Sequence, residues 1–457
     1  MPVTAGGAAH NDRVWESGLS ARTRKSTSPV RWCPRCGLIQ PPANFCRQCG
    51  LAAPTDVPPG FLSRKRTGCI KPVFFSALTI GAACMLLVVL LNVFVATGLD
   101  IRAIGLALSA AILPTLLYGA LIVWLDRNEP ESWELRGLAF FWGAVVAIFF
   151  ALFLNTAAWS FFTVASNRDT GSILTVVAVA PLVEESVKGL AVLVVLWFTR
   201  RHIDGVLDGM LIGALVGLGF AMTENITYFG MAYSDGGAAA VGTLFIIRSV
   251  INGMGHAVWT SFTGAAIGWA RTRHGRGVLR LIVPIIGWGV AVLGHSIWNL
   301  GASLTITILA IGLERVFFLP EWQAYIIGGI VGGLPFSVPP LLIALLIALL
   351  GRDQESRVVR RYLPIEIGLG TLTPEEYEAV TDPQARKTAL EAARREGGAR
   401  RRRQQRQFNQ IATRLAFFHY HAIEGERPYL PEIRRAEQLR WNLSALRWSM
   451  LNPAEAA

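Results

Sequence analysis

The chain has 457 residues, of which 52% are hydrophobic and only 16% are charged, and its mean hydropathy is +0.43. This composition is too apolar for an ordinary soluble protein and excludes that class. The net charge is +12, and it divides into +8 over residues 1–72, −1 over 73–351 and +5 over 352–457. The basic ends therefore flank an apolar block, which favours anionic inner-leaflet lipid over nucleic acid as their partner.

Two Cys-x₂-Cys pairs lie near the N-terminus, in the segment CPRCGLIQPPANFCRQCG. Four thiolates at this spacing predict a very small zinc ribbon over residues 31–51 that holds a structural Zn²⁺. Its predicted ligands are Cys33, Cys36, Cys46 and Cys49. Disulfides are the alternative, which the cytoplasmic location inferred below disfavours. We expect a disordered N-terminus over 1–30, and a linker with a basic juxtamembrane segment over 52–72.

The central block, residues 73–351, predicts an all-α, polytopic transmembrane helical bundle of about eight spans. The expected spans cover residues 73–97, 101–125, 137–164, 172–198, 205–229, 241–270, 279–313 and 325–350. The seventh is long enough to kink at Pro284 or to end in a re-entrant piece. In the eighth, Pro335, Pro339 and Pro340 predict a break.

Lys and Arg residues separate cleanly between the two sides of this predicted bundle. One side carries nearly all of them, whereas the other side carries only Arg102, Arg168 and Arg315. The positive-inside rule therefore predicts a multi-pass protein of the cell membrane with both termini in the cytoplasm. An even number of spans requires the same arrangement.

Ionisable residues predicted at membrane depth are confined to four consecutive spans, the fourth to the seventh. They are Glu184, Glu185, Lys188, Glu224, Arg248, His256 and His295. A charge near the bilayer centre costs about 2.5–3.5 kcal/mol, and such residues normally face the bundle interior and mark function. We therefore expect the acids and imidazoles to converge on a single wetted pocket.

Helical spacing suggests how these side chains are directed. Glu184 and Lys188 are four residues apart and share a face, so they can form an ion pair that has a purely structural role. Glu185 lies about 100° further round the helix and can point elsewhere. Arg248 is expected to pair with a carboxylate. Glycines nearby, including Gly217 and Gly264, predict close approach of these helices.

The segment after residue 352 predicts a basic, helical cytoplasmic tail over 352–457. Thr373, Pro374 and Glu376 form the N-cap, first-turn proline and capping box of a predicted helix. The segment ARRRRQQRQ, residues 399–407, indicates a solvated helix face or a surface that binds anionic lipid. The tail or the ribbon could also bind a cytoplasmic protein partner.

Carboxylates and histidines together in a membrane can activate water for hydrolysis of a peptide bond. A buried Glu can act as general base, or Glu224, His256 and His295 can hold a catalytic Zn²⁺. Asn299, with a histidine, could donate to the oxyanion of a tetrahedral intermediate. The remaining polar residues are expected to support these groups: Lys188, Arg248, Asn225 and Asn252. The residues alone leave open whether the water is metal-bound.

Four segments that carry these residues resemble, in order, motifs of the PrsW family of intramembrane proteases, distant relatives of the CAAX-prenyl endopeptidases. They are EESVK at 184–188, GLGFAMTEN at 217–225 with DGVLDG upstream, the pair Arg248 and His256, and HSIWN at 295–299. The resemblance covers roughly residues 170–300. It implies a multi-helix fold that cleaves a membrane-embedded substrate near its extracytoplasmic side.

In known members of that family the substrate is an anti-sigma factor, so a single-span membrane protein is the expected partner. The family's catalytic roles would fall on Glu184, Glu185, Glu224, His256 and His295. A proton- or ion-coupled transporter is the alternative function, because buried Glu and His chains also relay protons. Transporters usually show internal repeats, and this sequence has no convincing one. A non-catalytic membrane scaffold is a third interpretation, and it leaves the polar set unexplained.

Overall fold

The structure is a computed structural model that describes residues 31–32, 39–40, 70–96, 98, 100–126, 131, 133–198, 205–272, 277–424 and 430–451. Within the predicted ribbon it describes only the strands β1 (Arg31–Trp32) and β2 (Ile39–Gln40), which pair antiparallel with Arg31 opposite Gln40. The four cysteines, the predicted N-terminus over 1–30 and the linker lie outside the described residues. The zinc ribbon therefore stays a prediction.

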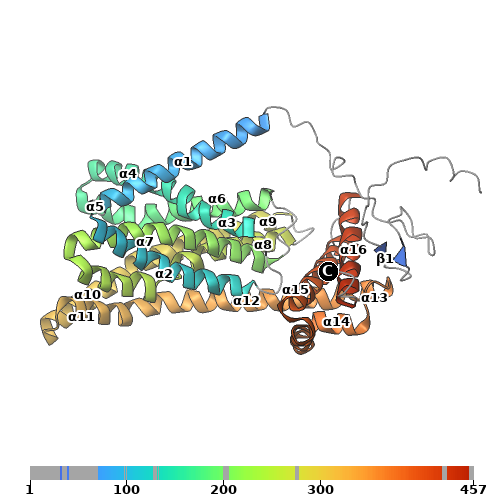
Figure 1. The fold of residues 1–457 in the computed structure, drawn as a ribbon. Coiled ribbons are helices and arrows are strands. Elements are labelled where there is room, and N and C mark those ends of the chain that lie inside the picture. The colour runs from blue at the N-terminus through green and yellow to red at the C-terminus, as the bar shows by residue number, and fades with distance from the viewer. Residues whose placement is uncertain are drawn as a thin grey trace, which may run out of the picture.

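The rest of the described chain is helical, as the sequence predicts (Figure 1). Before the first charged site residue come α1 (Ile70–Ala96), α2 (Ile101–Leu125), α3 (Trp133–Phe141), the π-helix η1 (Trp142–Ala147), α4 (Ile148–Ala165), α5 (Arg168–Leu174) and η2 (Thr175–Val179). The site elements are α6 (Ala180–Phe198), α7 (Val206–Phe245), η3 (Ile246–Ile251), α8 (Gly255–Thr272), α9 (Leu279–Ile297) and η4 (Trp298–Ala302). Then follow α10 (Ser303–Phe317), α11 (Glu321–Gly328), η5 (Gly329–Gly333) and α12 (Leu334–Tyr362).

Among the described residues, five helical stretches are long and apolar enough to cross a membrane: 101–125, 133–165, 206–271, 279–317 and 321–368. This supports a multi-pass membrane protein, but it does not confirm the predicted count of eight. The predicted fourth span, α6, carries Glu184, Glu185 and Lys188 within its first ten residues. Helix α1 is covered only in part, over the apolar stretch Gly81–Asn92. The stretch 206–271 has 66 residues. One crossing needs about 20 residues, so this stretch is long enough to cross the membrane more than once.

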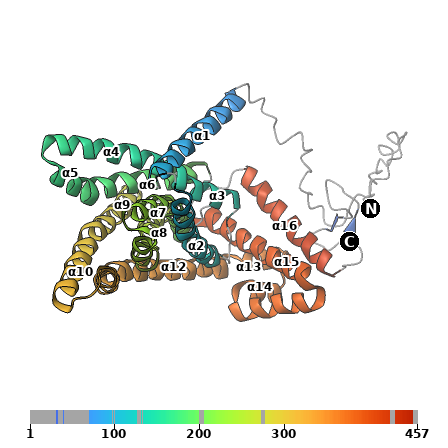
Figure 2. The same cartoon turned by 60° about the vertical axis from the view of Figure 1, so that its left-hand side comes forward.

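Helices α7 and α8 run antiparallel at the centre of the bundle, where the other membrane helices surround them (Figure 2). Glycines of α7 lie against α8 in register. A Cβ on Gly217 would lie 2.2 Å from the carbonyl oxygen of His256, and one on Gly213 would lie 2.5 Å from that of Thr260. A Cβ on Gly209 would lie 2.2 Å from the carbonyl oxygen of Gly264. The glycines let the two backbones touch, as small residues do between membrane helices.

The chain reverses direction between α7 and α8, and regular helix is interrupted at two places on the way. Gly236 and Gly237 have non-helical backbone angles inside α7, and Gly237 has φ of 66°. Residues 252–254 then separate η3 from α8. The stretch 206–271 therefore passes the site twice, once in α7 and once in α8, as the predicted fifth and sixth spans require.

The prolines do not end the helices in which they lie. Helix α9 continues through Pro284, and α12 continues through Pro339 and Pro340, while Pro335 occupies the first turn of α12. Two π-helical turns lie elsewhere in the same spans, η4 after α9 and η5 before α12. Neighbouring helices and local π adjustments can re-satisfy the backbone groups that a membrane proline frees, so hydropathy and proline position alone do not place a break.

The tail forms a helical unit that continues α12 beyond the end of the bundle (Figure 1). It contains α13 (Pro364–Gly368), α14 (Pro374–Thr381), α15 (Pro383–Glu424) and α16 (Leu430–Leu451). The predicted capping box of α14 is confirmed, with Thr373 and Glu376 each bonding the other's backbone N–H. Glu366, fully buried, accepts hydrogen bonds from Arg440 at 2.7 and 3.0 Å and lies 2.7 Å from Nε2 of His419. These contacts tie α13, α15 and α16 together.

Candidate active site

The structure brings the predicted acids and imidazoles together from α6, α7, α8 and α9. Glu184 Oε2 lies 4.0 Å from His295 Nε2, and Glu185 Oε1 lies 3.3 Å from His295 Nδ1. His256 Nε2 lies 3.1 Å from Glu224 Oε2. The two imidazole rings meet edge to face, with their centroids 4.9 Å apart. All five side chains are thus joined in a single cluster.

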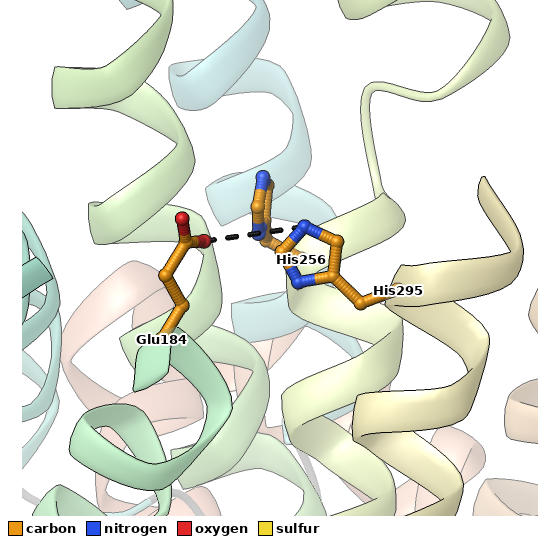
Figure 3. A group of neighbouring side chains, drawn as sticks. All are labelled: Glu184, His256 and His295. Carbon is orange, nitrogen blue, oxygen red and sulfur yellow. Dashed lines mark ion pairs between the residues drawn. The ribbon is translucent and has the colours of Figure 1, made fainter. Parts of the chain in front are cut away.

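Three members of the cluster are arranged as metal ligands would be. Glu184, His256 and His295 are all buried, and each offers one ligand atom within 4.8 Å of the others. Figure 3 shows these side chains pointing toward one another from three different helices. The expected ligand set of Glu224, His256 and His295 differs at one position, because Glu184 takes the place of Glu224.

Glu185 lies behind this group and contacts it through His295 Nδ1 at 3.3 Å. Its carboxylate accepts hydrogen bonds from Lys188 Nζ at 2.8 Å and from Thr260 Oγ1 at 2.9 Å. Lys188 also pairs with Glu184 at 3.5 Å, as its spacing predicts, and its ammonium lies 3.9 Å from the centroid of the Phe220 ring. Both Glu185 and Lys188 are fully buried. The adjacent glutamates therefore have separate environments, as the 100° between them allows.

Glu224 forms the opposite edge of the cluster with Arg248. The Arg248 guanidinium pairs with the Glu224 carboxylate, and its Nε donates to Asn225 Oδ1 at 2.7 Å. The same guanidinium lies over the Tyr228 ring, 3.9 Å from its centroid. The expected pairing of Arg248 with a carboxylate is therefore present, and Asn225 helps to orient it. Glu224 is balanced by a cation that comes from η3.

A cavity of about 460 Å³ adjoins the cluster. Its walls include Glu184, Glu224, His256 and His295, whereas Glu185 and Lys188 are not among its lining residues. The volume lies within the range of ordinary ligand pockets, and the lining mixes carboxylates, imidazoles and amides with apolar side chains. The cavity gives water or a polar chain segment access to the buried acids.

Two of the expected supporting amides also line this cavity. Asn299, on η4, donates from Nδ2 to the carbonyl oxygen of Val176 on η2 at 2.8 Å. Asn252 lies between η3 and α8, where its Oδ1 accepts from Ser337 Oγ of α12 at 3.4 Å. These contacts join neighbouring elements around the cavity. They involve the π-helices η2 and η4 and the irregular residues 252–254, and π-helical turns are frequent at functional sites.

The sequence analysis did not identify two contacts of the cluster. Asn155 of α4 donates from Nδ2 to Glu184 Oε1 at 3.2 Å. The indole of Trp259 stacks on the His295 ring, with centroids 4.5 Å apart and planes inclined by 15°. Asn155 is a single polar residue in an apolar span, and Trp259 is one of 14 tryptophans in the chain. Neither residue carries a sequence signal of its own.

The donor set fits a metal ion such as zinc. Zinc is held by His nitrogens and Glu oxygens, and catalytic sites commonly use three protein ligands and a water. Glu184 Oε2 is a buried oxygen that lies 3.5 Å from Lys188 Nζ but has no hydrogen-bond partner in the described chain. Such an oxygen is costly to bury unless something binds it. Glu185 contacts His295, and Asn155 donates a hydrogen bond to Glu184. These contacts orient the two ligand side chains, as the groups around metal ligands commonly do.

Comparisons with known proteins bear on this same part of the chain. No curated protein and no solved structure matches the chain. Residues 131–325 match the family model described as the PrsW family intramembrane metalloprotease. This range contains every residue of the cluster and of the amides that line its cavity. The match agrees with the resemblance drawn from the four sequence motifs, so this part of the chain is similar to the PrsW family intramembrane metalloproteases.

Proposed function

We propose that the membrane domain is an endopeptidase that hydrolyses a peptide bond of a membrane-embedded protein. The observation that carries the proposal is the convergence of Glu184, His256 and His295 within 4.8 Å beside a cavity of about 460 Å³. Hydrolysis inside a bilayer needs water that is held and polarised, and buried acids with imidazoles at a wet cavity supply both requirements.

Glu184, His256 and His295 are the residues that would hold a zinc ion. When bound there, zinc would acidify a water molecule and polarise the scissile carbonyl. Glu224 lines the cavity outside this ligand set, so its carboxylate is the group placed to accept a proton from the attacking water. Arg248 balances and orients Glu224. Glu185 would orient His295 through the contact between their side chains, and the hydrogen bond from Thr260 would orient Glu185.

The amides at the cavity would contact the substrate chain. Asn252 and Asn299 line it on the side of η3 and η4, and a side-chain amide can donate to a carbonyl oxygen that gains negative charge. Asn299 also bonds the backbone of η2, which fixes its position. A substrate segment must leave its helical hydrogen bonds to be cut, and such amides can bond the carbonyl groups that are then freed.

The finer features of the proposal come from the sequence. The substrate would be a single-span membrane protein, similar to an anti-sigma factor, cut near its extracytoplasmic side. The protein would lie in the cell membrane with about eight spans and both termini in the cytoplasm. Domains would follow the boundaries 1–30, 31–51, 52–72, 73–351 and 352–457, with a structural Zn²⁺ in the ribbon. The ribbon or the tail could then receive a cytoplasmic partner.

Substitution of two residues of the site tests the proposal. Glu184→Gln and His256→Ala should leave the protein inserted in the membrane but stop processing of its substrate. The measurement compares the membrane proteomes of cells that express the wild type, each variant and Glu321→Gln, a matched control at an exposed glutamate of α11. A single-span protein should be shortened only with the wild type and the control. Identical proteomes for all four proteins would refute the protease function.

A further inference from the structure

A second cavity lies where the tail meets the membrane domain. It has a volume of about 820 Å³ and is lined by residues of α12, α14 and α15, together with Trp124 from the last turn of α2. It is separate from the cavity at the acids and imidazoles, and no lining residue belongs to both. The protease function proposed above leaves this cavity without a role.

Basic side chains predominate in its lining. The cavity is bordered by Arg352, Arg360, Arg386, Lys387, Arg402 and Arg406, against the two acids Glu355 and Glu391. One of those acids, Glu355, also lies near Gly205 at the start of α7. Like charges gathered around a concave surface raise the local concentration of anions.

Four basic groups at the cavity have no carboxylate partner among the described residues. Within the described chain, no carboxylate lies within 4 Å of the basic groups of Arg360, Lys387, Arg402 or Arg406. Three other arginines of these helices, which do not line the cavity, are paired. Arg361 lies 3.8 Å from Glu424, Arg401 lies 3.2 Å from Glu396, and Arg357 pairs with Asp353. Arg357, Arg361 and Arg401 thus have acidic partners, whereas none is found within 4 Å of the four basic groups at the cavity in the described chain.

The position of the cavity is at the membrane boundary. Trp124 closes the apolar helix α2, and Arg352 follows directly after the apolar part of α12. Tryptophan is enriched at the level of lipid headgroups, where one side of the ring is wet. We therefore expect the cavity to lie near the depth of the phosphate groups of a membrane.

We propose that this cavity binds a small phosphate-bearing anion. Arginine guanidinium groups offer paired N–H donors that match phosphate oxygens. Unpaired basic groups from α12 and α15 would share one such ligand, so binding would fasten the tail to the membrane domain. A volume of about 820 Å³ exceeds the space of a single inorganic phosphate and suits a lipid headgroup or a soluble diphosphate.

The test uses the full-length protein in uncharged detergent micelles and measures its thermal unfolding midpoint. Three probes are added separately: a short-chain phosphatidylglycerol, the phosphatidylcholine with the same chains, and inorganic pyrophosphate. Arg402→Gln with Arg406→Gln removes two unpaired cavity charges. Arg395→Gln with Arg403→Gln is the matched control, since it removes two exposed charges from α15 outside the cavity.

An anionic probe should raise the midpoint of the wild type and of the control pair. For the cavity pair the apparent dissociation constant should rise by about tenfold or more, because two charged contacts are lost. A response to phosphatidylglycerol alone identifies a lipid headgroup as the ligand, and a response to pyrophosphate identifies a soluble phosphate. An equal response of both variant pairs, an equal response to phosphatidylcholine, or no response of the wild type would overturn the proposal.

Discussion

The ammonium nitrogen of Lys188 lies 2.9 Å from Nδ1 of His256. The other ring nitrogen, Nε2, lies 3.1 Å from Glu224 Oε2, so the lysine and the glutamate contact opposite edges of the imidazole. A residue of α6 thus sets the orientation of an imidazole on α8. The charged residues accordingly form two groups. Glu184, Glu224, His256 and His295 face the cavity, whereas Glu185 and Lys188 support them from behind.

The ion pair of Glu185 and Lys188 should stabilise the fold as a unit. Glu185→Gln alone should lower the free energy of unfolding by about 3–5 kcal/mol, because it leaves the fully buried ammonium with a weaker partner. Lys188→Met should cost a similar amount. The double variant should lose less than the sum of the two, as a double-mutant cycle by denaturant unfolding in micelles will show. Strictly additive losses would show that the two side chains do not stabilise each other.

The hydrogen bond from Thr260 to Glu185 can be tested with a neighbouring threonine as control. Thr260→Val removes the donor to a buried carboxylate and should cost about 1–3 kcal/mol of stability, together with activity, since Glu185 holds His295. Thr260→Ser should retain both. Thr263 lies on the same helix and is buried, but its Oγ1 has no partner in the described chain. Thr263→Val should therefore be neutral or stabilising. Equal losses for the two valine variants would argue against the bond.

Metal content should separate the two glutamates that face the cavity. The experiment uses a chain in which Cys33, Cys36, Cys46 and Cys49 are replaced by Ser, so that the predicted ribbon holds no zinc. This chain should retain about one zinc per molecule by elemental analysis. Glu184→Gln should abolish that zinc, whereas Glu224→Gln should retain zinc and still lose proteolysis. The reverse pattern would restore Glu224 as the third ligand, and no zinc in the parent chain would indicate a metal-free water.

The contact between α7 and α8 should be essential for the site. Gly217→Ala would place a Cβ 2.2 Å from the carbonyl oxygen of His256, so the helices must separate, at a cost of about 1–3 kcal/mol. Because His256 lies at that contact, substrate processing should fall as well. Gly289→Ala on α9 is the control, since nothing lies within 4 Å of its added Cβ. A loss of processing that is equal in both variants would show that helix separation is not its cause.

Several features of this protein could be predicted from residues close together in the sequence. Hydropathy locates the apolar helices because the free energy of burying a segment in lipid is a sum over its own residues. The capping box of Thr373 and Glu376 follows from groups three positions apart. The same holds for the pairing of Glu184 with Lys188, four positions apart. The expectation that acids and imidazoles converge follows from the cost of leaving them in lipid.

Other features depend on how the helices are rotated and packed against one another. Hydropathy could not show that Pro284 and Pro339 lie within continuous helices, since neighbouring elements decide whether freed backbone groups are satisfied. Spacing shows that Glu184 and Glu185 diverge, but only the packing of α6 on α8 and α9 decides which of them faces the cavity. The packing of these helices also decides that Glu184, and not Glu224, lies close enough to both histidines to share a metal ion with them.

The sequence by itself therefore determined that this chain is a helical membrane protein with a buried set of acids and histidines. Only the tertiary structure decided which of those groups line a cavity and which support them from behind. It also placed unpaired arginines of α12 and α15 around a second cavity. The physical reason is that helix formation and lipid burial are local energies, whereas the meeting of side chains depends on the crossing and register of helices distant in the chain.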